Sequence, residues 1–242
     1  MTTNTLHNNP ALLDQLSGQE RQLAVLIDPD TELEQIRKTL MYVNRAQVNY
    51  IFVGGSLMYK GNVESTIKLV KQHTELPVVL FPGSEMQLSD QADALLFISL
   101  LSGRNPSLLI GKHVEVAPFI AQMNLEVLPT GYLLIDGGRI TSASYMSQTL
   151  PIPSDKPGIA VATALAGKYL GLKIMYLDAG SGAINPVPAE MIQAVKHHTQ
   201  LPVIVGGGIT NSQGVYDAWN AGANVVVVGN RLEQNPEVLL SL

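Results

Sequence analysis

Short apolar segments alternate with amphipathic segments along most of the chain. Eight segments bounded by Gly, Pro, Asp or Ser are almost continuously apolar, which is typical of parallel strands covered on both faces. They span residues 23–27, 50–53, 78–81, 94–98, 133–135, 174–177, 203–205 and 225–228. Between most of them, apolar residues recur every three or four positions, as on one face of a helix. Strand alternating with helix in this way predicts a (β/α)₈ (TIM) barrel with a parallel sheet.

Local signals add detail to this pattern. Thr31 followed by Glu34 predicts a capping box at the start of the first helix, and a helix is expected to begin near Asn211 after the seventh strand. Residues 137–157 combine paired glycines with three prolines, so we expect an irregular insertion after the fifth strand, either a loop or an extra hairpin. The length of 242 residues fits a single domain over 1–242, with 1–20 as a polar N-terminal extension.

Composition narrows the class of protein. A net charge of −5 argues against nucleic acid or an anionic membrane surface as the main partner. The absence of cysteine excludes disulfides, thiolate metal sites and a cysteine nucleophile. Residues 1–20 do not have the pattern of a signal peptide, and the most apolar stretch, 94–101, is far shorter than the roughly 20 residues of a spanning helix. We expect a cytoplasmic protein without stable membrane insertion.

Three glycine-rich segments follow the last three predicted strands. The sequences are YLDAGSGA at 176–183, VGGGI at 205–209 and VGN at 228–230. Glycines expose backbone N–H groups, and a helix N-terminus adds a favourable dipole, so the pattern predicts a phosphate site at the C-terminal end of the barrel. Tyr176 and Asp178 share one side of their strand. The alternative is that these glycines only form tight turns and that Asp178 only caps its own turn.

Carboxylates and a hydroxyl follow the first two predicted strands. Asp28 and Asp30 end the first strand, and Ser56 follows the glycine pair 54–55 after the second. Hard oxygen ligands of this kind suit Mg²⁺, which commonly uses one or two carboxylates together with substrate phosphates. We favour Asp28 as the ligand, because Asp30 directly precedes a helix and is a candidate for its N-cap. For Asp28 the alternative is a structural hydrogen bond to the neighbouring loops.

In order along the chain, LIDPD at 26–30, VGGSL at 53–57 and the three glycine-rich segments resemble the geranylgeranylglyceryl phosphate synthase family, in its longer, broader branch found in archaea and bacteria. The resemblance implies a (β/α)₈-barrel prenyltransferase that joins sn-glycerol 1-phosphate to a polyprenyl diphosphate with Mg²⁺ in ether-lipid synthesis. It implies Asp28 and Ser56 as metal ligands and Asp178 and Tyr176 as catalytic residues. It assigns glycerol phosphate binding to Tyr176, Leu177, Asp178, Ala179, Gly180, Ser181, Gly182, Gly206, Gly207, Gly208, Gly229 and Asn230.

Members of that family often have Glu where this chain has Asp178, so a base at this position relies on a small backbone shift or an intervening water. The implied mechanism is ionisation of the allylic diphosphate, attack by the glycerol 3-hydroxyl and proton transfer to Asp178. The resemblance also implies a homo-oligomer. Candidates to bind the diphosphate are Arg104, Lys112 and His113. The simpler explanation for each of them is a solvated charge on the surface of a helix. Candidates for the wall of a prenyl groove, or alternatively for the core, are Leu100, Leu101, Leu108, Leu109, Ile110, Val114 and Val116.

Other functions stay open at this point. Another phosphate-binding barrel, such as an isomerase, an aldolase or a thiamin-phosphate-type synthase, has the same fold, and fold alone does not decide chemistry. Aldolase chemistry is disfavoured, because no lysine stands at the end of a predicted strand. A non-catalytic phosphate sensor is a further alternative, although it would need neither the carboxylate and hydroxyl at the first two strands nor Asp178.

Overall fold

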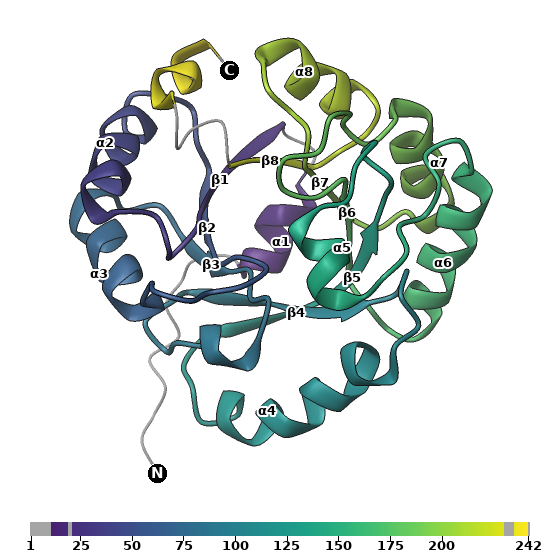
Figure 1. Cartoon of the computed structure of the whole chain (residues 1–242), viewed down its shortest axis with the longest axis horizontal. Helices are drawn as coiled ribbons and strands as arrows, with labels where there is room; N and C mark the ends of the chain where they lie inside the picture. The colour runs from purple at the N-terminus through teal and green to yellow at the C-terminus, as the bar shows by residue number, and fades with distance from the viewer. Residues whose placement is uncertain (1–10, 19–20, 230–234, 242) are drawn as a thin grey trace.

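Eight parallel strands close into a barrel in the computed structural model, which describes residues 11–18, 21–229 and 235–241 (Figure 1). Each strand pairs with its neighbours in chain order, and β1 closes the ring by pairing with β8. The predicted (β/α)₈ fold is therefore confirmed. The strands are β1 (Gln22–Ile27), β2 (Tyr50–Val53), β3 (Val78–Leu80), β4 (Ala94–Leu100), β5 (Glu126–Leu134), β6 (Ile174–Asp178), β7 (Val203–Gly206) and β8 (Val225–Val228).

Helices surround the barrel, as the outer ring in Figure 1 shows. The connection after β3 is an exception, because it holds only the 3₁₀ turn η1 (Glu85–Gln87), and its Pro82, Gly83 and Ser84 do not favour a helix. The other elements are α1 (Leu12–Ser17), α2 (Leu33–Val43), α3 (Val63–His73), the π-helical turn η2 (Ser107–Gly111), α4 (Lys112–Ile120), α5 (Ser142–Ser147), α6 (Pro157–Tyr169), α7 (Ala189–Thr199), α8 (Ser212–Asn220) and the 3₁₀ helix η3 (Pro236–Ser241). None of the helices in the described ranges is long and apolar enough to cross a membrane.

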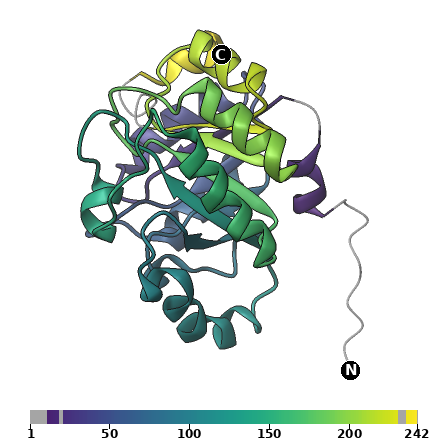
Figure 2. The same ribbon diagram turned by 90° about the vertical axis from the view of Figure 1, so that its right-hand side faces the viewer.

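Two layers of apolar side chains hold the barrel together. An outer layer packs between strands and helices, whereas an inner layer fills the barrel itself, as the alternation of side chains along each strand requires. Helix α1 belongs to the inner layer, since Leu12 and Leu16 pack beneath the strands. Glu126 at the start of β5 accepts hydrogen bonds from the backbone N–H groups of Leu12 (2.6 Å) and Leu13 (3.0 Å). Helix α1 therefore closes the N-terminal end of the barrel, opposite α5 (Figure 2).

Helix α2 starts differently from the prediction. It begins at Leu33 with Glu32 as its N-cap, and no side chain caps its first turn. The capping box predicted for Thr31 and Glu34 is therefore wrong. Thr31 instead belongs to a turn, in which its N–H donates to the carbonyl of Asp28. The prediction for α8 is confirmed, because Asn211 is its N-cap and accepts a hydrogen bond from the N–H of Gly214.

The insertion after β5 is a loop that carries one short helix. Thr141 and Ser144 cap α5 reciprocally, so this helix has its own local start signal. Ile152 then forms an isolated parallel bridge with Ile135, which rules out the hairpin that was the second possibility. Of the two predicted alternatives the loop is correct. It places α5 over the C-terminal end of the barrel, where the strands lead into the candidate site (Figure 1).

Candidate functional site

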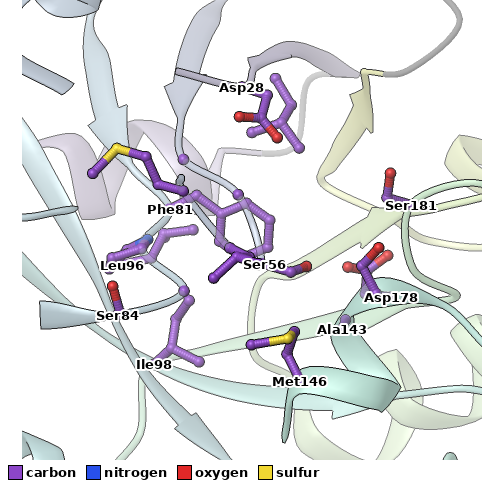
Figure 3. Close-up of a pocket in the computed structure, with 18 of the residues that line it drawn as sticks. Asp28, Ser56, Phe81, Ser84, Leu96, Ile98, Ala143, Met146, Asp178 and Ser181 are labelled. Atoms are coloured by element: carbon purple, nitrogen blue, oxygen red, sulfur yellow. The ribbon is translucent and has the colours of Figure 1, made fainter. Parts of the chain in front are cut away.

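A cavity of about 1210 Å³ opens at the C-terminal ends of the strands. Loops that follow β1, β2, β3, β5, β6, β7 and β8 all contribute to its wall, together with α4 and α5. Figure 3 shows polar residues at different sides of this space, with Asp28 apart from Asp178 and Ser181, and apolar residues such as Leu96 and Ile98 along a third side. The cavity thus combines two polar regions with an apolar one.

The loops after β6 and β7 depend on glycine. Gly180, Gly207 and Gly208 have φ angles of +87°, +80° and +71°, a region that other residues rarely adopt. A Cβ atom at Gly207 would lie 2.4 Å from the backbone nitrogen of Gly180 and 2.6 Å from Asp178 Oδ1. The two loops therefore pack directly on each other, and only glycine allows that approach. Helix α8 starts just beyond Gly208, so the loop leads into a helix N-terminus of the kind that favours anions.

The described residues among those predicted to bind glycerol phosphate divide into three groups. Tyr176, Asp178, Ser181, Gly182, Gly207, Gly208 and Gly229 line the cavity. Leu177 and Ala179 are directed away from it, because their side chains pack in the outer apolar layer. Gly180 and Gly206 shape the loops without lining the cavity. Asn230 lies outside the described residues.

Asp178 is buried, and both of its carboxylate oxygens are engaged. Oδ1 accepts a hydrogen bond from the N–H of Gly180 at 2.7 Å, and Oδ2 accepts one from the hydroxyl of Tyr132 at 2.5 Å. Burial raises the pKa of Asp178, and the two hydrogen bonds oppose that shift by stabilising the carboxylate. The predicted turn cap is thus present, yet the same side chain also faces the cavity. Asp178 therefore combines a structural contact with a position suited to a base.

Tyr132 is a site residue that the sequence did not reveal. It lies on β5 directly opposite Tyr176 on β6, and burial together with the charge of Asp178 holds the pKa of its hydroxyl well above the usual range. Its neighbours are aromatic: the rings of Phe81 and Tyr176 stack with centroids 4.9 Å apart, and Tyr132 meets Tyr176 edge-on at 5.4 Å. The sequence pattern did not point to Tyr132, because the predicted fifth strand covered only residues 133–135 and this tyrosine lies just before them.

On the opposite side, Asp28 and Ser56 line the cavity after β1 and β2. Asp28 Oδ1 accepts a hydrogen bond from the N–H of Asp30 at 2.9 Å. A Cβ atom at Gly55 would lie 2.7 Å from Asp28 Oδ2, so glycine is needed for the second loop to pass this carboxylate. Burial raises the pKa of Asp28; the hydrogen bond from Asp30 lowers it, and the charge of Asp30 raises it further.

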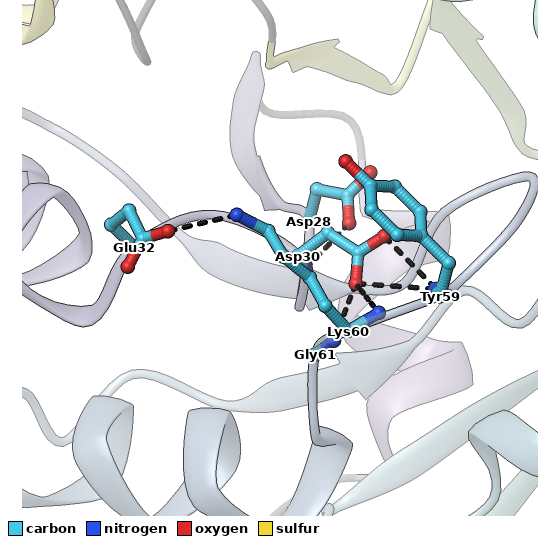
Figure 4. Close-up of polar contacts among 6 residues, drawn as sticks. All are labelled: Asp28, Asp30, Glu32, Tyr59, Lys60 and Gly61. Atoms are coloured by element: carbon cyan, nitrogen blue, oxygen red, sulfur yellow. Dashed lines mark hydrogen bonds and ion pairs between the residues drawn. The ribbon is translucent and has the colours of Figure 1, made fainter.

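Asp30 does not have the capping role that was considered for it. Its carboxylate accepts hydrogen bonds from three consecutive backbone N–H groups in the loop after β2, those of Tyr59 (3.1 Å), Lys60 (3.0 Å) and Gly61 (2.5 Å) (Figure 4). It does not cap α2, whose N-cap is Glu32. Asp30 therefore joins the loop after β1 to the loop after β2.

The apolar side of the cavity lies between the middle strands, α4 and α5. Its wall includes Leu96, Ile98, Leu108, Val116, Ile120 and Met146. Of the predicted wall residues, Leu100, Leu108 and Val116 line the cavity. Leu101 and Leu109 pack in the outer apolar layer, whereas Ile110 and Val114 are exposed on the outer surface. Among the basic candidates, Lys112 and His113 line the cavity and Arg104 does not.

The described site is a cavity at the C-terminal end of a (β/α)₈ barrel, with glycine loops after β6 and β7, a buried carboxylate and an adjoining apolar wall, which is the class of site that suits a phosphate ester beside an apolar group. The PcrB family matches residues 17–241, so the chain belongs to the PcrB family. Together with the names of the similar proteins that follow, the family match confirms the resemblance found in the sequence and the predicted enzyme class, a prenyltransferase.

Relatives that are similar in sequence carry the name geranylgeranylglyceryl phosphate synthase. The geranylgeranylglyceryl phosphate synthase of Spirosoma linguale is 47% identical over 94% of this chain and 91% of its own, and that of Pyrococcus furiosus is 41% identical over 86% and 83%. The crystal structure of (S)-3-O-geranylgeranylglyceryl phosphate synthase from Thermoplasma acidophilum in complex with sn-glycerol-1-phosphate superposes with a TM-score of 0.89 at 29% identity, covering 96% of both chains. An N-acetylmannosamine-6-phosphate 2-epimerase from Clostridium perfringens shares only the fold, at 14% identity and a TM-score of 0.61.

Proposed function

We propose that this protein joins sn-glycerol 1-phosphate to a polyprenyl diphosphate, such as the geranylgeranyl ester, and releases diphosphate. The observation that carries the proposal is the continuity of the glycine loops, the buried carboxylate and the apolar wall within one cavity. At about 1210 Å³ this cavity exceeds the roughly 300–1,000 Å³ of most small-ligand sites, which leaves room for two substrates. The names of the similar proteins and the substrate in the Thermoplasma acidophilum complex support the same reaction.

The glycerol phosphate end of the reaction takes place at β6 and β7. The phosphate is held by backbone N–H groups of Gly207 and Gly208 and by the loop that contains Ser181 and Gly182, at the start of α8. The glycerol 3-hydroxyl attacks the terminal carbon of the prenyl chain, and the carbon–oxygen bond to the diphosphate breaks. Diphosphate leaves with the bonding electrons, and the hydroxyl proton passes to Asp178. Tyr132 keeps that carboxylate oriented through its hydrogen bond.

Asp28 and Ser56 fit a magnesium ion, which we include in the proposal. Both side chains present hard oxygen atoms to the cavity. The described residues contain no group of three carboxylate, histidine or cysteine ligands, so substrate oxygens and water would complete the coordination, as is usual for Mg²⁺. When bound, the ion supplies neutralisation of the charge that develops on the leaving diphosphate.

The apolar wall accounts for the prenyl chain. Each CH₂ group that leaves water contributes about 0.8 kcal/mol, so a chain of several isoprene units gains substantial affinity from this wall. Leu96, Ile98 and Met146 are drawn along one part of the cavity in Figure 3, away from Asp28. The oligomeric state and the cellular location are not decided by the cavity. The homo-oligomeric state and the cytoplasmic location that were expected from the sequence stay predictions. Sedimentation velocity tests the oligomeric state.

Turnover of sn-glycerol 1-phosphate with a radiolabelled prenyl diphosphate tests the proposed function. We expect an organic-soluble labelled product that depends on both substrates and on Mg²⁺. The sn-glycerol 3-phosphate enantiomer is the matched control, because it has the same charge and size. Equal binding of the two enantiomers in a calorimetric titration would contradict the assignment of the glycerol site.

A further inference from the structure

Two lysines line the cavity in the described part of the chain, and they differ in their surroundings. Lys112 on α4 lies between two carboxylates, those of Glu85 at 3.0 Å and Glu115 at 3.1 Å. Lys60, in the loop after β2, has one acidic partner, Glu32 at 2.8 Å. The two lysines belong to different walls, since Lys60 follows the strand that also leads to Ser56. Lys60 is therefore the cavity-lining lysine on the side of Asp28 and Ser56.

The backbone that carries Lys60 is held in place by a neighbouring loop. Its own N–H group donates to Asp30 Oδ1 at 3.0 Å, and the N–H groups on either side of it donate to the same carboxylate (Figure 4). Asp30 in turn donates its N–H to Asp28. This chain of hydrogen bonds connects the position of Lys60 with that of Asp28. The lysine is thus anchored at the rim before any ligand binds.

The ion pair between Lys60 and Glu32 is exposed and weak, so an anion that carries more charge can displace Glu32 from the ammonium group. The side chain of Lys60 is 49% exposed and that of Glu32 is 80% exposed. Exposed pairs of this type contribute little to stability, because water screens the charges and both side chains lose freedom when they pair. A diphosphate carries more charge than a carboxylate and offers more acceptor oxygens to an ammonium group.

We propose that Lys60 is a binding residue for the diphosphate group of the prenyl substrate, and that Glu32 is the counter-ion which the ammonium group leaves when that substrate binds. This assignment rests on the proposed function, since it names the part of the site that holds the second substrate. Asp28, Asp30 and Glu32 make this side of the cavity acidic, and Lys60 supplies a positive charge there that faces the incoming diphosphate.

Calorimetric titration with inorganic pyrophosphate in the presence of Mg²⁺ tests the assignment. We expect Lys60→Met to weaken binding about tenfold, as for the loss of one charge-assisted hydrogen bond, and Lys60→Arg to stay within about threefold of the unaltered protein. Glu32→Gln removes the competing anion and should tighten binding. Lys71→Met is the matched control, because Lys71 forms an ion pair of the same length, 2.8 Å, with Asp93 and does not line the cavity.

The outcomes separate this assignment from the proposed function. A change of less than about threefold in Lys60→Met, or a change equal to that in Lys71→Met, would overturn it. So would Lys112→Met if it weakened binding while Lys60→Met did not. The pyrophosphate titration needs no prenyl transfer. It therefore measures the contribution of Lys60 to pyrophosphate affinity even if the protein turns over no prenyl diphosphate. Conversely, full turnover with unchanged pyrophosphate binding in Lys60→Met would leave the function intact and remove Lys60 from it.

Discussion

Replacing Tyr132 by Phe removes one hydroxyl from the candidate site and leaves its ring in place. The lost contact is the 2.5 Å hydrogen bond to Asp178 Oδ2, while packing against Phe81 and Tyr176 is retained. A hydrogen bond to a charged group contributes about 1.5–3 kcal/mol, so the variant should lose roughly 10- to 100-fold in kcat/KM near neutral pH. The loss follows because a buried carboxylate with one donor fewer is harder to ionise.

The pH dependence of kcat/KM shows in which direction the loss of the Tyr132 hydroxyl moves the pKa of Asp178. Asp178 acts as a base only when it is ionised, and burial already raises its pKa. The hydrogen bond from Tyr132 lowers that pKa, so its removal raises the pKa further and moves the acid limb of the profile to higher pH. The Tyr132→Phe variant should therefore recover part of its activity as the pH rises. The assay is kcat/KM for sn-glycerol 1-phosphate from mildly acidic to mildly alkaline pH.

Tyr50→Phe is the matched control for this experiment. Tyr50 is also buried, its hydroxyl donates a hydrogen bond of the same length, 2.5 Å, to Gln22, and it does not line the cavity. It should lower the melting temperature without moving the acid limb. If Tyr132→Phe gave an unchanged acid limb and full activity, or lost activity equally at every pH, Tyr132 would not orient the base.

Three further predictions concern single side chains. Asp178→Asn should lower kcat by roughly 10² to 10⁴, the usual contribution of general acid–base catalysis, and change glycerol phosphate binding much less; an active Asn variant would mean that the base lies elsewhere. Asp28→Ala should abolish turnover and leave glycerol phosphate binding nearly intact in a titration, whereas unchanged activity of the unaltered protein in EDTA would remove the metal from the proposal. Glu126→Gln should destabilise the protein by about 1 kcal/mol with kcat unchanged, because α1 loses a charged acceptor at its N-terminus; an unaltered denaturation midpoint would contradict this.

Local sequence determined the barrel and much of its rim. The apolar segments 50–53 and 225–228 coincide with β2 and β8, because a strand buried on both faces needs apolar residues at every position. The glycine-rich loops could also be predicted from the sequence, since positive φ angles and close backbone approach require glycine at Gly207 and Gly208. The resemblance, which rests on LIDPD at 26–30, VGGSL at 53–57 and the three glycine-rich segments, identified the family.

Tertiary structure decided the contacts between segments that lie far apart in the chain. Residues 126–132 do not have an apolar strand pattern, yet they form most of β5, because β4 pairs with all of them and β6 pairs with the strand from Thr130 onward. The hydrogen bond from Tyr132 to Asp178 joins residues 46 positions apart, and that from Lys60 to Asp30 joins residues 30 apart. Strand register and loop packing bring such side chains together. A linear pattern records which groups are present, whereas the closed barrel alone determines which of them meet.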